Sequence, residues 1–224
     1  TVELLLQTFD FSESGGYWPE WIPVLEKALA NAPKRKTLLH GRIQNRLGQL
    51  YRLDRRIQEA EEKHNEALAL ADKIASDELL LISYTCLAEL KLTQKNVEQT
   101  RKFGKLGLAL ANALPGYERM EGFNNFILGQ IEDYVGNHPA AVQHLKEAGV
   151  VWQKLENHLY WARSLQSLGA VYIKINKYEQ AEKSFATAGQ ILKTTTYIKD
   201  HASILINLAV LFFRQEKWSQ AEEA

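Results

Sequence analysis

The side chains that most often carry chemistry are few in this sequence, and their spacing does not bring them together. Six histidines occur, at His40, His64, His138, His144, His158 and His201. None pairs with another at the i, i+4 spacing with which one helix face presents two metal ligands. His138 and His144 are six residues apart, so a helix would place them on different faces. We therefore expect packing or surface roles for the histidines and predict no metal site.

The remaining candidates for chemistry are one cysteine and one glycine pair. Cys86 lies in the apolar stretch from Ser83 to Leu90 with no base implied nearby, and is expected to be a small buried hydrophobe rather than a nucleophile. A single cysteine also excludes an internal disulfide and a thiolate cage. Gly15-Gly16 lacks the following Lys and Ser or Thr of a phosphate-binding loop. We therefore predict no catalytic residues, no cofactor and no enzymatic activity.

Composition is that of an ordinary folded protein in solution. Apolar residues make up 46% and charged residues 24% of the 224 positions, which suits a packed core rather than disorder. Lys and Arg together number 27, as do Asp and Glu, so the basic balance of a general nucleic-acid binder is missing. No apolar run approaches the roughly 18–20 residues that span a bilayer. We expect a cytoplasmic protein that binds no membrane, with nucleic acid disfavoured as a partner.

The same pattern recurs about every 40 residues along the chain. Small residues that follow a leucine are separated by 40, 41, 40 and 40 positions, at Gly48, Ala88, Gly129, Gly169 and Ala209. Twelve residues after each lies a second position that is mostly alanine, at Ala60, Thr100, Ala141, Ala181 and Ala221. Seven residues later come Ala67, Gly107, Ala148 and Ala188, with His64, Gly104, Leu145 and Phe185 between the two sets. The chain has only 5 prolines and is dominated by helix formers, so each period is predicted to be a pair of helices.

This spacing has a physical reading. A small residue on the first helix lets the second helix approach closely, and small residues two turns apart on the second helix form a shallow groove that receives it. The apolar face of such a hairpin is too large for the hairpin to bury alone, so each hairpin must stack on a neighbour.

The repeats resemble the tetratricopeptide-repeat (TPR) family. The fullest match to the family signature is Leu168, Gly169, Tyr172, Tyr178, Ala181, Phe185 and Ala188. The period exceeds the family's usual length of about 34 residues by about six, which predicts helices of about 15–17 residues. Such long repeats are similar to those in the sensor arms of bacterial signal-transduction ATPases and in kinesin light chains. The segment from Gly16 to Trp21 resembles the hairpin that often begins such a sensor arm.

The resemblance implies an all-α fold, a right-handed superhelical solenoid of about six antiparallel helical hairpins. We expect one domain over residues 1–224 with hairpins at 2–40, 41–80, 81–121, 122–161, 162–201 and 202–224, the last truncated. The chain begins at Thr1 and its only methionine is Met120, so we expect a piece of a longer protein. Leu205, Leu208, Phe212 and Trp218 need cover at the C-terminal end, which predicts either further repeats or association end to end.

In such a stack the first helices line the concave face, and the resemblance implies which of their positions point toward a partner. The predicted partner-binding groove consists of Arg42, Asn45, Arg46, Gln49, Arg52, Glu89, Phe126, Gln130, Asp133, Arg163 and Gln166. The sixth hairpin offers Ser203, Ile206, Asn207, Val210, Phe213 and Arg214 at the same positions. One family mechanism is not supported, because Asn45, Gln49, Cys86, Phe123 and Ile127 do not supply the Lys, Asn and Arg clamp with which chaperone-binding members hold a C-terminal carboxylate.

Charge is polarised locally although the chain is neutral. Residues 33–56 hold eight basic residues against one acid, an excess of +7, whereas residues 57–78 hold seven acids against two lysines, an excess of −5. The basic stretch could capture an acidic or phosphorylated segment, since Arg binds carboxylate and phosphate bidentately. The alternative is a solvated face neutralised by the adjacent acidic helix. Likewise Phe123, Phe126 and Tyr134 could form an apolar groove floor or pack against the next repeat.

Two hypotheses for function follow. The first is a non-catalytic interaction scaffold that binds a protein or peptide, an acidic one being a candidate, or another copy of itself, as the TPR portion of a larger bacterial regulator. The second is a small-molecule- or nucleic-acid-responsive sensor domain whose ligand enters the groove.

Overall fold

The structure is a computed structural model, and it describes residues 18–31, 37–193 and 195–217. These residues form α-helices joined by short turns, with no strand among them, as the sequence predicts. Gly15-Gly16, Trp218 and the repeat position Ala221 lie outside the described residues. Among the described helices, none is long and apolar enough to cross a membrane.

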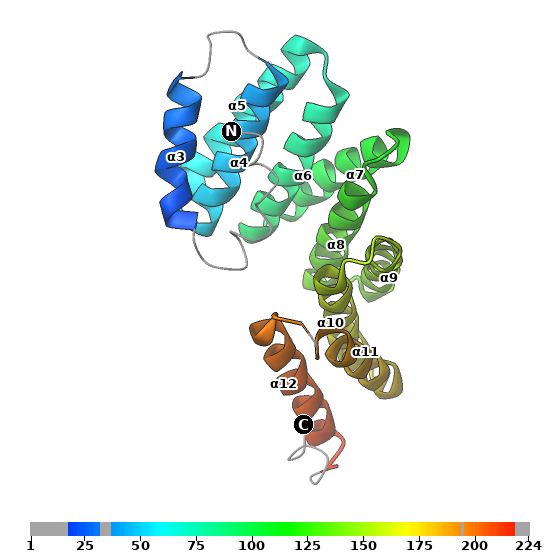
Figure 1. The fold of residues 1–224 in the computed structure, drawn as a ribbon. Coiled ribbons are helices and arrows are strands. Elements are labelled where there is room, and N and C mark those ends of the chain that lie inside the picture. Colours follow the sequence, from blue (N-terminus) through cyan, green and yellow to red (C-terminus); the bar gives the residue numbers. More distant parts are fainter. Residues whose placement is uncertain (1–17, 32–36, 194, 218–224) are drawn as a thin grey trace. The chain divides into compact units, whose positions relative to one another are not determined.

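The chain divides into two compact units (Figure 1), residues 1–120 and 121–224. The described helices that lie wholly in unit 1 are α3 (Trp18–Asn31), α4 (Leu38–Leu53), α5 (Ile57–Ile74), α6 (Asp77–Thr93) and α7 (Val97–Ala113). Unit 2 holds nearly all of α8 (Glu118–Tyr134), then α9 (His138–Lys154), α10 (His158–Lys174), α11 (Tyr178–Leu192) and α12 (Ile198–Arg214). We call α4, α6, α8, α10 and α12 the first helices of their hairpins, and α5, α7, α9 and α11 the second helices.

Within each unit, helices pack on their neighbours in sequence and first helices pack on one another. In unit 1, α3 lies against α4, α4 against α5, and α4 also against α6. In unit 2, α10 lies between α9 and α11 and also contacts α12. The core of unit 2 includes Leu168, Phe185 and Leu211, and that of unit 1 includes Leu47 and Leu50. The described residues therefore stack as repeating hairpins, which is the arrangement of a helical-repeat solenoid.

The turn after each first helix has the same backbone form. A residue with positive φ follows the helix, and the next residue donates its N–H to a carbonyl five positions earlier, the bond that closes a Schellman motif. These bonds join the N–H of Arg56, Asn96, Asn137, Lys177 and Lys217 to the carbonyl oxygens of Tyr51, Lys91, Glu132, Tyr172 and Phe212, at 2.8, 2.9, 2.8, 2.8 and 3.0 Å. The residue with positive φ is glycine only at Gly136, so composition alone marks only one of these turns clearly.

The predicted close approach of paired helices is confirmed at three glycines. A Cβ added to Gly48 would lie 2.6 Å from the His64 ring, one on Gly129 2.7 Å from Leu145, and one on Gly169 2.7 Å from the Phe185 ring. Each partner lies sixteen residues after its glycine. In the hairpin of α6 and α7, the residues at these two positions are Ala88 and Gly104, both buried. Here the first helix carries the larger residue and the second helix carries the glycine.

The described helices are 14 to 18 residues long. The first helices begin at residues 38, 77, 118, 158 and 198, three or four residues before the starts of the expected hairpins. That the two units continue as one domain over residues 1–224 stays a prediction.

Candidate functional site

The groove residues expected from sequence fall on first helices, six of them in unit 1 and five in unit 2. In unit 1, Arg42 pairs with Glu78, and Arg52 pairs with Glu89 at 2.7 Å. Each of these ion pairs joins α4 to α6. Arg46 donates a hydrogen bond to Gln49 on its own helix at 2.9 Å. The basic side chains of α4 are thus met largely by carboxylates of the next first helix rather than of the adjacent α5.

Asn45 has a different environment from its neighbours on α4. Its side chain is 1% exposed. Its Nδ2 donates to Ser83 Oγ at 2.9 Å, and its Oδ1 lies 3.0 Å from His64 Nδ1, which sets Nδ1 as the protonated nitrogen. Asn45 therefore links α4, α5 and α6 from inside unit 1.

In unit 2 the same kind of bridge joins consecutive first helices. Arg163 Nε donates to Asp200 Oδ1 at 2.7 Å and its Nη2 to Oδ2 at 3.3 Å, a bidentate pair between α10 and α12. Gln166 Nε2 donates to Ser203 Oγ at 2.8 Å. Lys174 Nζ donates to Asp133 Oδ2 at 2.6 Å, which joins α10 to α8.

The two remaining groove candidates lie on α8. Phe126 is partly buried and packs against the core cluster of unit 2, as the packing alternative for this ring expects. Gln130 is half-buried. Inter-helix bridges are thus formed by Arg42, Asn45, Arg52 and Glu89 in unit 1 and by Asp133, Arg163 and Gln166 in unit 2. We call the bridging surface of α4 and α6 the first-helix face of unit 1, and that of α8, α10 and α12 the first-helix face of unit 2.

Sequence reasoning missed Glu78 and Asp200, which complete two of these bridges. Arg42 and Glu78 are 36 residues apart, whereas Arg52 and Glu89, and Arg163 and Asp200, are 37 apart. An opposite charge about three residues short of one full period is the signal that could have found them.

The first-helix face of unit 2 continues as an apolar stripe on α12. Ile206, Val210 and Phe213 are 64%, 45% and 61% exposed. Their spacing of four and three residues places them on one side of α12, beside Ser203, whereas Asp200 lies about a quarter of a turn or more away around the helix. An exposed apolar stripe on a helix face is a feature that marks interaction surfaces.

The described residues contain no cluster of three or more His, Cys, Asp or Glu side chains that could hold a metal ion. Burial raises the pKa of Cys86 to about 12, and the side chain is 4% exposed, so it is a thiol at neutral pH and packs as expected.

The bridge between Arg52 and Glu89 gives a direct test of coupling between first helices. Because the Arg52 side chain is only 13% exposed, a double-mutant cycle with Arg52→Met and Glu89→Gln is expected to give a coupling energy of about 1 kcal/mol. The matched control is Arg56 and Glu59, an i, i+3 pair with side chains 36% and 44% exposed, where we expect a much smaller coupling energy because water screens the two charges. Urea unfolding followed by circular dichroism measures both. Additive effects in the first cycle would show that the bridge does not couple α4 to α6.

No protein-family model and no curated protein sequence matches this chain. Solved structures do resemble it. BtubC (BKLC) from P. vanneervenii is 19% identical with a TM-score of 0.74, over 93% of this chain and 85% of that one. A STAND protein with a tetratricopeptide repeat sensor from Pyrococcus horikoshii is 15% identical with a TM-score of 0.77, over 97% of this chain and 34% of that one.

A third similar structure is a Rap protein complexed with Competence and Sporulation Factor. It is 20% identical with a TM-score of 0.69, over 89% of this chain and 55% of that one. The present chain therefore spans about a third of the STAND protein and about half of the Rap protein. At such identities the likeness concerns the fold, which is a TPR-like, all-α helical-repeat solenoid.

Proposed function

We propose that this chain is a non-catalytic interaction scaffold of the cytoplasm, the TPR-like portion of a larger bacterial regulator, and that a protein or peptide partner binds along its first helices. The observation that carries the proposal is the stripe Ile206, Val210 and Phe213, which exposes apolar side chains at positions where a partner was expected. Covering such a stripe gains the hydrophobic free energy that drives most protein association.

The ion pair and hydrogen bonds that join α10 to α12 also support this assignment. Arg163 and Gln166 fix α10 to α12 through Asp200 and Ser203, so the stripe stands on a helix that is held in place beside its neighbour. A surface organised before binding loses less conformational entropy when the partner arrives. The Rap structure was solved in complex with Competence and Sporulation Factor, which shows that a similar fold is found with a bound partner.

The nucleic-acid alternative has less support in the described residues. It rested on the basic stretch, and three of its arginines, Arg42, Arg52 and Arg56, are each paired with a glutamate. A cation already held by a carboxylate offers less to a phosphate backbone, since the existing pair must first be broken.

The test is selection of peptides from a displayed random library on the immobilised chain, followed by affinity measurement on variants. We expect the double variant Ile206→Ser with Phe213→Ser to weaken the selected peptides by about tenfold or more, because two apolar anchors are lost. Both side chains are largely exposed, so folding should change by no more than about 0.5 kcal/mol per site.

The matched control is Val150→Ser on the second helix α9, where the side chain is 66% exposed. This variant should bind the selected peptides as well as the wild-type chain does. Equal binding by the α12 double variant and the wild-type chain would refute the first-helix assignment.

A further inference from the structure

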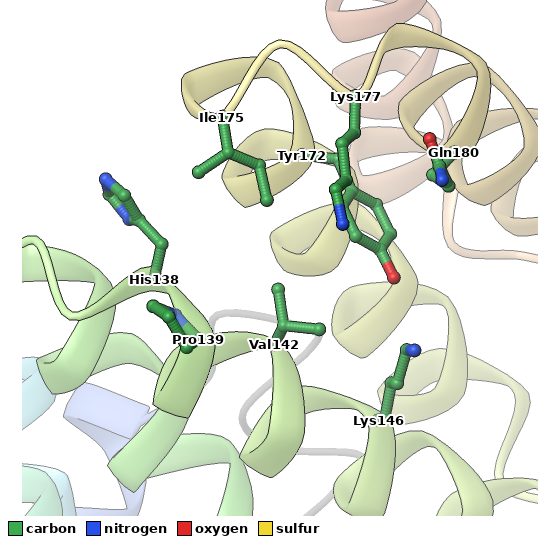
Figure 2. Close-up of a pocket in the computed structure, with 8 residues that line it drawn as sticks. All are labelled: His138, Pro139, Val142, Lys146, Tyr172, Ile175, Lys177 and Gln180. Carbon is green, nitrogen blue, oxygen red and sulfur yellow. The ribbon is translucent and has the colours of Figure 1, made fainter.

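A cavity of about 350 Å³ opens in unit 2, and none of the bridging residues described above lines it (Figure 2). It lies where α9 meets the turn between α10 and α11. Its apolar wall is formed by Pro139, Val142 and Ile175. Its polar lining consists of Lys146, Lys177, Gln180, His138 and Tyr172. The cavity is large enough for one or two side chains of a ligand rather than for a whole helix.

Tyr172 brings an unused hydroxyl to this cavity. The side chain is 7% exposed and belongs to the core cluster of unit 2, yet its Oη makes no hydrogen bond with any described residue. Figure 2 shows the Tyr172 ring between the side chains of Lys177 and Lys146, with the hydroxyl turned toward Lys146. Neither lysine forms an ion pair with a described residue. The hydroxyl itself is not buried. It reaches solvent at the cavity, where an acceptor group of a ligand can take its hydrogen bond.

The chain contains a filled version of the same site in unit 1. Tyr51 occupies the repeat position of Tyr172, and its Oη donates to Glu26 Oε1 at 2.6 Å. The guanidinium of Arg56 lies over the Tyr51 ring, 4.1 Å from its centroid. Burial, with the Glu26 hydrogen bond second, raises the pKa of Tyr51 to about 12. In unit 1, therefore, a carboxylate accepts a hydrogen bond from the tyrosine hydroxyl and a cation covers the ring.

The correspondence between the two sites follows from backbone and core positions. The N–H of Arg56 bonds the carbonyl of Tyr51 at 2.8 Å, as the N–H of Lys177 bonds that of Tyr172 at 2.8 Å. On the helices that precede α4 and α10, Leu25 in α3 and Leu145 in α9 are both 1% exposed. The residue after each of these leucines is the charged one that lies beside the tyrosine, Glu26 in α3 and Lys146 in α9.

The charges of the two sites are opposite. Lys146 lines the cavity with Tyr172 as Glu26 lies beside Tyr51, although 26 residues separate Lys146 from its tyrosine and 25 separate Glu26 from its own. Glu59, which binds Arg56 at 2.6 Å in unit 1, is replaced by Gln180. The positive charge of Arg56 is kept in unit 2, where Lys177 occupies the same repeat position. The carboxylate Asp133 is 3.4 Å from His138 but is already bonded to Lys174 at 2.6 Å. In α6, the repeat position of Tyr51 and Tyr172 is occupied by Lys91. Lys91 also pairs with a carboxylate of the preceding helix, Glu61, at 2.6 Å.

We propose that this cavity binds a carboxylate that the chain itself does not supply, the side chain of a glutamate or aspartate in an acidic segment of a partner protein. The carboxylate takes the place that Glu26 occupies in unit 1. Tyr172 Oη donates to it, Lys146 and Lys177 flank it, and the wall of Pro139, Val142 and Ile175 receives an apolar neighbour of the acidic residue. This site is separate from the stripe on α12, so it goes beyond the proposed function.

The experiment is a titration followed by backbone amide chemical shifts of Lys146, Tyr172 and Lys177. The probe is an acetylated, amidated tripeptide with glutamate between two leucines, and its partner probe carries glutamine instead. We expect the glutamate peptide to bind about tenfold more tightly than the glutamine peptide, because charged acceptors make the stronger hydrogen bonds. Sodium acetate should compete weakly with it. Equal binding of the two peptides, or binding of inorganic phosphate in place of the glutamate peptide, would overturn the assignment.

Variants assign the binding to this cavity. Lys146→Glu restores the unit 1 arrangement from within the chain, so the glutamate peptide should lose about tenfold or more in affinity while the fold is kept. Tyr172→Phe removes only the hydroxyl, and Phe212 already occupies the same repeat position in α12, so the affinity should fall several-fold without unfolding. Lys199→Glu makes the same charge change at an exposed position of α12 and should leave binding intact. Wild-type affinity in Lys146→Glu would rule out this cavity, whatever the variants of the α12 stripe show.

Discussion

Acidification from pH 7 to pH 4 is expected to destabilise unit 1 by about 3 kcal/mol through His64 alone. The ring is 0% exposed, and burial, with the charge of Arg52 second, lowers its pKa to about 3 from 6.5. Between these two pH values the unfolded chain binds a proton that the folded chain does not. Stability from His64 is therefore present in full above about pH 6.5 and is lost at up to about 1.4 kcal/mol per unit as the pH falls toward 3.

The measurement is urea unfolding at several pH values for the wild-type chain and for His64→Leu. Leucine is the residue found in the matching place over Gly129, where Leu145 is 1% exposed. The variant is expected to be less stable at neutral pH, because Asn45 Oδ1 loses its donor, at a cost of about 1–3 kcal/mol. Its pH dependence should nevertheless be shallower than that of the wild-type chain, while other titrating groups contribute equally to both. Parallel pH profiles would show that His64 can accept a proton without unfolding the surrounding helices.

The same substitution is expected to have opposite effects at two buried glycines of unit 2. Gly169→Ala should destabilise the chain by about 1–2 kcal/mol, because the new Cβ would lie 2.7 Å from the ring of Phe185, which is 1% exposed and cannot move aside. This net value already includes the gain of about 1 kcal/mol that alanine brings in a helix interior.

Gly149→Ala is the matched case. Its Cβ would lie 3.9 Å from Ser164 and 4.0 Å from Trp161, which is ordinary contact, so only the gain in helix propensity remains, and stability should rise by about 0.5–1 kcal/mol. Thermal and urea unfolding should therefore separate the two variants by roughly 1.5–3 kcal/mol. A stabilised Gly169→Ala would mean that α10 and α11 have room to separate, contrary to the packing described here.

The sixteen-residue pairs show which part of the packing could be predicted from the sequence. The small residues at Gly48, Gly129 and Gly169 stand at a regular period, so their role in close helix approach could be inferred without coordinates. The partner of each could be located, because one side chain between two small positions faces back toward the first helix. Ala88 and Gly104 have the same spacing, and the structure buries both of them.

The candidate sites were less predictable, because they depend on neighbours far away in sequence. The basic residues Arg42 and Arg52 fall on the expected helix, yet their pairing with Glu78 and Glu89 depends on how α6 lies beside α4. Asn45 was expected on the groove from its repeat position, and the structure buries it between helices with His64 and Ser83. Helical periodicity gives the face of a residue only to within about one position. An error of one position is enough to confuse a residue that forms a surface ion pair with one that forms a buried hydrogen bond.

The class of the fold, the length of its period and the helix pairs that the small residues bring together could be inferred from the amino-acid sequence, because these depend on local propensity and on spacings along one chain. Which charges are neutralised, and which are left for a ligand, depends on how the helices pack in three dimensions. Lys146 and Glu26 are both exposed charged residues on the helix that precedes a first helix. Only the structure shows that Glu26 bonds Tyr51 whereas Lys146 lines a cavity with Tyr172. The physical reason is that the free energy of a charge or a hydroxyl is set by the groups within a few ångströms of it, and here those groups come from neighbouring helices.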